Sequence, residues 1–102
     1  MNILVFGKDG QLGKAFSALL RQPSVFANAQ ITYLGRAECD LSNEVNVHAH
    51  LNAAKPNLII NASAYTAVDK AETEVDLAFA VNAKAPEIMA RYAAENDATF
   101  LH

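Results

Sequence analysis

The stretch GKDGQLG at residues 7–13 decides the fold of this chain. An apolar run at residues 3–6 precedes it, and apolar residues spaced three and four positions apart follow it at residues 12–20. A short apolar run with branched residues predicts a strand that is buried on both faces of a parallel sheet. The spacing in the second stretch predicts a helix with one apolar face. The apolar positions of this helix are Leu12, Ala15, Phe16, Leu19 and Leu20.

The three glycines between this strand and this helix have different expected roles. Gly7 permits the tight turn out of the strand, and Gly10 removes a side chain where a diphosphate must approach the backbone. Gly13 lets the helix pack close to the sheet. The free N–H groups and the positive dipole end at the start of the helix favour phosphate binding. The turn therefore predicts a dinucleotide site, and a tight turn without a ligand is the alternative.

Strands and helices are predicted to alternate along the chain. Strands are expected at residues 3–6, 31–34 and 58–61 and from residue 99, and helices at residues 12–20, 47–54 and 77–92. This order predicts an α/β fold, a Rossmann-type doubly wound parallel sheet with right-handed crossovers. Residues 1–102 are expected to be the N-terminal part of one dinucleotide-binding domain, truncated after the start of the strand that follows the long helix. An unpaired edge and an uncovered sheet face would result, so we expect marginal stability or self-association, with a homodimer as the candidate assembly.

Composition argues against several classes of partner. The net charge is −3 and the basic residues are scattered, so we expect neither a nucleic-acid partner nor a membrane contact. The apolar N-terminus is too short for a signal sequence, and Cys39 has no intrachain partner, so a cytoplasmic location is expected. Cys39 is interpreted as a small half-buried apolar residue, and His48 and His50 as exposed residues of a helix. No spacing of Cys and His predicts a metal site.

The end of the second predicted strand bears on the choice of cofactor. In a dinucleotide-binding fold, a carboxylate at this point accepts from the ribose of NAD, whereas an Arg accommodates the 2′-phosphate of NADP. Arg36 stands here and no carboxylate comes before Glu38. We therefore expect NADPH to be preferred to NADH, with a solvated Arg36 as the alternative. Asp40 and Leu41 follow where the fold usually contacts adenine, although a cap or turn role would also explain Asp40.

The segment after the third predicted strand is the most specific part of the sequence. It reads NASAYTAVDKAE at residues 61–72, and its small residues let the chain pass close under a flat ligand. Together with GKDGQLG, this segment resembles the dTDP-4-dehydrorhamnose reductase family of the extended short-chain dehydrogenase/reductase group. The resemblance runs the whole length of the chain, and VNA at residues 81–83 and Pro86 also fit it.

The resemblance implies how the chain would hold its cofactor. The glycine turn would bind the diphosphate, the segment after the third strand would line the nicotinamide ribose and ring, and Asn82 would lie beside that ribose. A buried Asn82 that is satisfied by the backbone is the alternative. The full set of expected contacts to NADPH (or NADH) is Gly7, Gly10, Gln11, Leu12, Gly13, Arg36, Asp40, Leu41, Ala62, Ala64, Tyr65, Thr66 and Asn82.

The resemblance also implies a reaction. The family reduces the C4 ketone of dTDP-4-dehydro-L-rhamnose to dTDP-L-rhamnose, a step of nucleotide-sugar and cell-surface polysaccharide biosynthesis. A Tyr supplies the proton, a nearby Lys lowers its pKa, and a Ser or Thr orients the ketone. The Ser or Thr would follow the strand that begins at Thr99, and the Tyr and Lys would come as Y-x-x-x-K on the next helix. The chain has none of these, so we expect no catalytic residue in it, weak dinucleotide binding and no turnover, with the dTDP-linked substrate bound by the whole protein.

Other interpretations remain open at this point. A non-catalytic dinucleotide-binding subunit, such as the regulatory subunit of methionine adenosyltransferase, would share the fold without the reaction. Another nucleotide-sugar epimerase or dehydratase of the extended group would share the glycine turn, but the segment at residues 61–72 disfavours it. A flavodoxin-like domain builds its phosphate loop differently, and the G-x-x-G-x-x-G spacing disfavours that fold.

Overall fold

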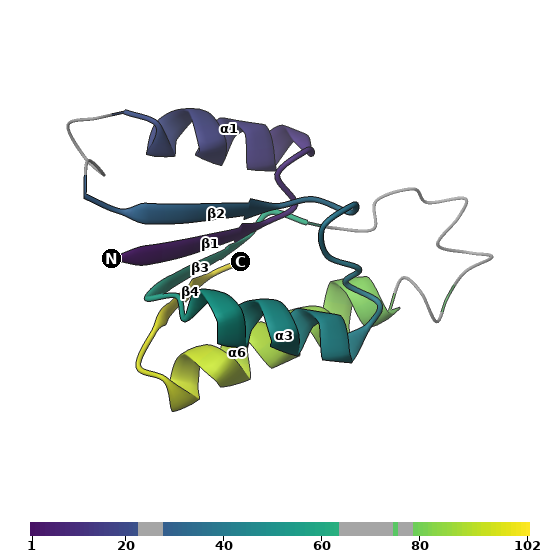
Figure 1. Cartoon of the computed structure of the whole chain (residues 1–102). Helices are drawn as coiled ribbons and strands as arrows, with labels where there is room; N and C mark the ends of the chain where they lie inside the picture. Colours follow the sequence, from purple (N-terminus) through teal and green to yellow (C-terminus); the bar gives the residue numbers. More distant parts are fainter. Residues whose placement is uncertain (23–27, 64–74, 76–78) are drawn as a thin grey trace.

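The computed structural model of the chain describes residues 1–22, 28–63, 75 and 79–102. Strands and helices alternate in the described residues, as the sequence predicts (Figure 1). The elements are β1 (Asn2–Phe6), α1 (Gln11–Leu20), β2 (Gln30–Leu34), α3 (Glu44–Ala54), β3 (Leu58–Asn61), the π-helical turn η1 (Ala80–Lys84), α6 (Ala85–Glu95) and β4 (Thr99–Leu101).

The four strands form one parallel sheet in the order β2-β1-β3-β4. The chain moves from β1 to β2 on one side and then crosses back to β3 on the other, so the direction of winding changes at β1. The register pairs Phe6 with Leu34 on one side and with Asn61 on the other. Three strands therefore end level with one another, and the loops that follow them leave the same edge of the sheet. Open α/β sheets bind ligands at such an edge.

Helices cover both faces of the sheet (Figure 1). On one face Ile3, Val5 and Ile60 form a core cluster with Leu20 of α1. On the other face Leu4, Phe6, Leu34 and Ile59 pack with residues of α3 and α6, among them Val47, Leu51, Ala85 and Met89. The strands β1 and β3 are buried on both faces because helices lie on both sides of them. This two-sided burial confirms the doubly wound α/β fold that the sequence predicts.

Helix α1 presents to the sheet only part of the apolar face that the spacing predicts, since Leu20 and Phe16 pack in the core cluster while Ala15 is exposed. Its buried residues are Gly13, Ser17 and Leu20, whereas Leu12 and Leu19 are 55% and 49% exposed. The helix turns its smallest residues inward because it approaches the backbone of the glycine turn very closely at Gly13. The buried Ser17 hydroxyl is satisfied by donating to the carbonyl oxygen of Gly13 at 2.8 Å.

Local signals set the ends of the two helices on the opposite face. Asn43 caps α3 by accepting from the backbone N–H of Asn46, and Lys55 ends the helix in the left-handed conformation with φ 46°. The predicted long helix is present as η1 followed by α6, with the cap residue Asn96 at its end. Its expected start at residue 77 lies outside the described residues.

Strand β4 is the least covered part of the sheet. Phe100 packs toward the α3 and α6 side, whereas Thr99 and Leu101, on the side of α1, are exposed. Leu101 is 46% exposed. None of the helices in the described part of the chain combines the length and the apolar character needed to cross a bilayer.

Candidate dinucleotide-binding site

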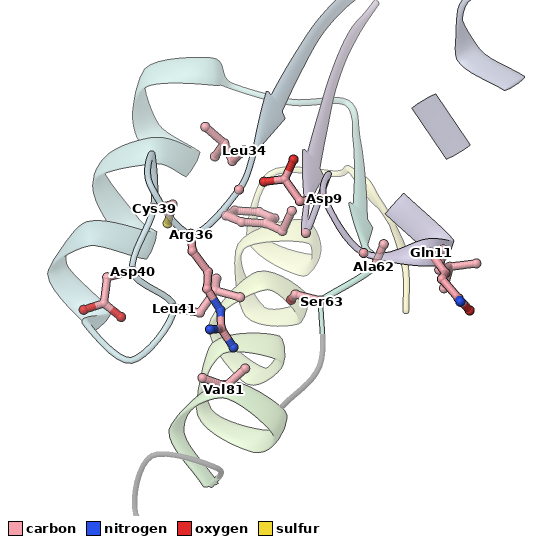
Figure 2. Close-up of a pocket in the computed structure, with 15 residues that line it drawn as sticks. Asp9, Gln11, Leu34, Arg36, Cys39, Asp40, Leu41, Ala62, Ser63 and Val81 are labelled. Atoms are coloured by element: carbon pink, nitrogen blue, oxygen red, sulfur yellow. The ribbon is translucent and has the colours of Figure 1, made fainter. Parts of the chain in front are cut away.

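A cavity of about 780 Å³ lies at the carboxyl ends of β1, β2 and β3 (Figure 2). The glycine turn, the loop after β2 and the first residues after β3 form its walls, and Val81 of η1 reaches it from the long helix. The described residues that line it are Phe6, Gly7, Asp9, Gly10, Gln11, Leu12, Leu34, Gly35, Arg36, Cys39, Asp40, Leu41, Ala62, Ser63 and Val81. Its size falls in the range of small-molecule and cofactor sites.

The three glycines of the turn differ in what surrounds them. Gly7 has φ 83°, and a Cβ on it would lie 2.6 Å from the backbone nitrogen of Ser63. A Cβ on Gly13 would lie 1.8 Å from the carbonyl oxygen of Gly7. Gly10 is exposed, and the nearest protein atom to its Cβ position is 3.8 Å away. The fold therefore requires Gly7 and Gly13, whereas Gly10 leaves open space beside the backbone on the cavity wall.

The N-terminus of α1 opens into the same cavity. Gly10 is the N-cap residue, and within the described residues no side chain caps this end of the helix. The first turn carries no acidic residue. The first N–H groups of a helix have no partner inside the helix, and the helix dipole places partial positive charge beside them. This end of α1 is therefore suited to an anionic group such as a diphosphate.

An ion pair joins the glycine turn to the loop after β2. Lys8 Nζ contacts Glu38 Oε1, and Glu38 Oε2 accepts from the backbone N–H of Gly35 at 3.1 Å. The backbone N–H groups of Gly7 and Lys8 both donate to the carbonyl oxygen of Leu34, at 2.8 and 3.1 Å. The hydrogen bond between Lys8 and Glu38 lowers the pKa of Glu38 below its usual 4.5 and raises that of Lys8 above 10.5. These contacts hold two walls of the cavity at a fixed separation.

The loop after β2 brings the predicted adenosine-side residues together at the cavity. Arg36 is exposed and its side chain extends across the cavity toward Val81 (Figure 2). Asp40 Oδ1 accepts from both the backbone N–H and the hydroxyl of Ser42, and these hydrogen bonds lower the pKa of Asp40. Asp40 therefore has the turn role that was its alternative, while it also lines the cavity with Leu41.

Two further predictions, for Cys39 in this loop and for His50 on α3, need correction. Cys39 is 3% exposed, so it is buried rather than half-buried, and burial raises the pKa of its thiol to about 11. His50 is half-buried rather than exposed, and its Nε2 lies 2.9 Å from the carbonyl oxygen of Glu38. His48 is exposed as predicted.

A buried amide organises the end of β3. Asn61 is 4% exposed, and its Oδ1 accepts from the backbone N–H of Ser63 at 3.1 Å and from the Ser63 hydroxyl. Its Nδ2 donates to Nδ1 of His102, just after β4, at 3.1 Å. Asn61 thereby fixes the turn that brings Ala62 and Ser63 to the cavity wall. The predicted contacts Ala64, Tyr65 and Thr66 lie outside the described residues.

The structure places Asn82 and Gly13 apart from the other predicted contacts. Asn82 is exposed on η1, and its neighbour Val81 is the residue of that turn that lines the cavity. Gly13 lies behind the wall, against Gly7, where it shapes the turn. The sequence analysis also missed Asp9 and Ser63 at the cavity. Asp9 stands at one of the unspecified positions of the G-x-x-G-x-x-G turn, and its place within that turn is the signal that could have found it.

The parallel sheet, the glycine turn and the cavity at the carboxyl ends of the strands define a Rossmann-type dinucleotide-binding fold. The family described as RmlD substrate binding domain matches residues 1–102, the whole length of the chain. The chain belongs to this family, that of the dTDP-4-dehydrorhamnose reductases. The resemblance found in the sequence is therefore confirmed.

Individual relatives agree with this assignment. The chain is 39% identical to the dTDP-4-dehydrorhamnose reductase of Escherichia coli K12 over 105 residues, covering 100% of this chain and 34% of the relative. The crystal structure of a dTDP-4-dehydrorhamnose reductase from Clostridium acetobutylicum is 35% identical, with a TM-score of 0.84, over 98% of this chain and 34% of that one. The enzyme from Bacillus anthracis, solved in complex with NADP, is 31% identical with a TM-score of 0.80, over 96% and 34% of the two chains. The chain thus spans about a third of the length of these relatives.

Proposed function

We propose that this chain forms the dinucleotide half-site of a reductase, and that the whole protein reduces dTDP-4-dehydro-L-rhamnose to dTDP-L-rhamnose with NADPH or NADH. The observation that carries the proposal is the cavity between the glycine turn and the loop after β2. Support for the reaction comes from the names of the relatives and from the NADP bound in one of them. We assign no catalytic residue to this chain and place the substrate's dTDP and sugar in the rest of the protein.

Each described part of the cavity has a role in this proposal. Gly10 lets the diphosphate approach the backbone, and the N–H groups of Gln11 and Leu12 face it at the positive end of α1, while Gly13 shapes the turn behind them. Arg36 and the loop to Leu41 receive the adenosine half. The turn held by Asn61 carries the chain under the nicotinamide half, for which we also propose Ala64, Tyr65, Thr66 and Asn82. When bound, the cofactor supplies the hydride.

Cofactor binding is tested by titrating the folded chain with NADPH and NADH, following nicotinamide fluorescence and calorimetry. Gly10→Asp should abolish binding without unfolding the chain, because its side chain has room in the protein but occupies the place of the diphosphate. The matched control is Ala18→Asp, which adds the same charge at an exposed position of α1. A folded chain that binds neither dinucleotide, or a Gly10→Asp chain that binds as well as the unaltered one, would refute the half-site.

The reduction itself requires a longer protein. We would replace the matching third of the Escherichia coli K12 reductase with residues 1–102 and measure oxidation of NADPH in the presence of the dTDP-4-dehydro sugar. Turnover that Gly10→Asp removes would support a catalytically competent half-site. A chimera that folds and binds NADPH without turnover would instead favour the non-catalytic dinucleotide-binding subunit.

A further inference from the structure

Asp9 occupies a position in the cavity that the glycine turn alone does not explain. It lines the cavity and is exposed, and Figure 2 shows its carboxylate beside the carboxyl ends of β1 and β2. A Cβ on Gly35 would lie 2.3 Å from Asp9 Oδ2. The carboxylate therefore rests directly on the bare Cα of Gly35, the first residue after β2. A side chain at residue 35 would displace it.

This carboxylate has no cation bound to it in the described residues. The nearest basic side chain along the turn, Lys8, forms its ion pair with Glu38, and the charge of Asp9 also helps to raise the pKa of Lys8. Neither of the two ion pairs found in the described parts of the chain includes Asp9. Among the described residues that line the cavity, the charged groups are Asp9, Asp40 and the guanidinium of Arg36. Asp9 therefore contributes a negative charge, only partly offset by Lys8, to the wall where the loop after β2 begins.

The residue just after the second strand is the point at which this fold meets the adenosine ribose. A carboxylate at that point accepts hydrogen bonds from the 2′-hydroxyl of NADH and repels the 2′-phosphate of NADPH. Arg36, one residue further along, has the opposite preference because its guanidinium binds phosphate. The chain thus places both kinds of recognition group at the 2′ position, and they come from different loops.

We propose that Asp9 is a cofactor-selectivity residue: its carboxylate accepts from the ribose 2′-hydroxyl of NADH and opposes the 2′-phosphate binding of Arg36. The inference rests on the proposed dinucleotide half-site and deepens it. The preference between NADH and NADPH is set by the balance of Asp9 against Arg36 and not by the loop after β2 alone. The NADPH preference expected from Arg36 is accordingly weakened in this chain.

The size of the effect follows from electrostatics. Solvent weakens the interaction of Asp9 with a 2′-phosphate, because Asp9 is exposed, but does not abolish it. Asp9→Asn should therefore raise the affinity for NADPH relative to NADH by about tenfold. Arg36→Gln should change the ratio by a similar factor in the opposite direction. The Asp9→Asn effect should shrink as the Debye length falls from about 30 Å to about 3 Å between about 0.01 M and 1 M salt.

The test is a titration of the unaltered chain and of each variant with NADH and NADPH, with far-UV circular dichroism to confirm folding. Asp97→Asn is the matched control, since it makes the same substitution at an exposed residue with φ 55°, a conformation that Asn also tolerates, outside the cavity. Asp9→Ser serves as a second variant in case Asp9→Asn fails to fold. A salt-dependent shift of the affinity ratio in the Asp9 variants, absent in Asp97→Asn, would support the proposal.

Failure of the inference and failure of the proposed function give different results. Both dinucleotides binding with an unchanged ratio in the Asp9 variants would overturn the selectivity role and leave the half-site intact. Equal weakening of both dinucleotides, independent of salt, would show that Asp9 only shapes the loop, and would overturn it as well. A folded, unaltered chain that binds neither dinucleotide would overturn the half-site and the inference with it.

Discussion

Gly13 lies so close to Gly7 that a Cβ on Gly13 would be 1.8 Å from the carbonyl oxygen of Gly7. Because this neighbour is backbone, Gly13→Ala must displace either the turn or the start of α1. We expect it to lower the free energy of unfolding by about 3 kcal/mol or more. Gly10→Ala meets no protein atom within 3.8 Å and should cost about 1 kcal/mol or less. Urea denaturation of the two variants gives the comparison.

The same pair of variants separates stability from binding. Gly10→Ala should fold nearly as well as the unaltered chain but bind dinucleotides more weakly, because its methyl group would project into the space where we propose that the diphosphate binds. Equal losses of stability in Gly10→Ala and Gly13→Ala would contradict the distinction that the structure draws between the two glycines.

The ion pair of Lys8 and Glu38 should make the stability of the loop after β2 depend on pH. The pKa of Glu38 is lowered from 4.5 in the folded chain, so its contribution to stability is present above that value and is lost as the pH falls through the folded pKa. The raised pKa of Lys8 makes its contribution present below 10.5 and lost as the pH rises through the folded value. Between these limits the backbone N–H of Gly35, which donates to Glu38 Oε2, should be protected from hydrogen exchange.

Glu38→Gln tests this contact. The variant removes the charge, so protection of the Gly35 amide should fall at neutral pH and should no longer decrease further on acidification. The ion pair is exposed, so we expect little change in global stability. Glu95→Gln, at an exposed position at the end of α6, is the control for the loss of one carboxylate. Protection at Gly35 that is unaffected by Glu38→Gln would show that the ion pair does not hold the two loops together.

Much of this fold follows from local sequence signals. The apolar run at residues 3–6 is buried on both faces of β1. As predicted, β1 ends just before Gly7 and the long helix ends just before Asn96. The lining of the candidate site was predictable where a rule links sequence position to chemistry, as it does for the glycine turn and for Arg36 after β2. These signals act within a few residues, so a single sequence contains them.

The remaining features depend on contacts between distant segments. The apolar spacing of residues 12–20 predicts a face that includes Leu12 and Leu19, but the close approach at Gly13 leaves these two exposed, while Leu20 stays on the core side. The place of Asp9 depends on the register of β1 with β2, which brings Gly35 beneath its carboxylate. Spacing along the chain does not encode either relationship.

The buried amide of Asn61 should contribute more to the free energy of unfolding than the Ser63 hydroxyl that donates to it. Asn61→Leu keeps the branched shape and the number of side-chain heavy atoms but leaves the backbone N–H of Ser63 without its acceptor at a half-buried turn. We expect a loss of about 2 kcal/mol in the free energy of unfolding, from a buried polar group left unsatisfied. Ser63→Ala removes the hydroxyl alone and should cost about 1 kcal/mol or less. Thermal and urea unfolding would show the difference, and equal costs would contradict a turn held by the Asn61 amide.

The thiol of Cys39 should make the chain sensitive to alkaline pH. Burial, with a smaller contribution from the charge of Asp40, raises its pKa from 9.0 to about 11. A raised folded pKa means that the stabilising effect of the buried neutral thiol is complete below pH 9.0 and is lost as the pH rises through about 11. The loss amounts to at most about 3 kcal/mol, at about 1.4 kcal/mol for each pKa unit.

Cys39→Ser isolates this effect because a serine hydroxyl does not titrate in the same range. The variant should be less stable at neutral pH, but its free energy of unfolding should decline less steeply than that of the unaltered chain between pH 9.0 and about 11. Alkylation gives a second measure: the thiol should react slowly in the folded chain and rapidly in urea, since it is 3% exposed. Parallel stability curves for the two proteins, or fast alkylation of the folded chain, would show that the thiol is accessible and that its burial does not control the pH response.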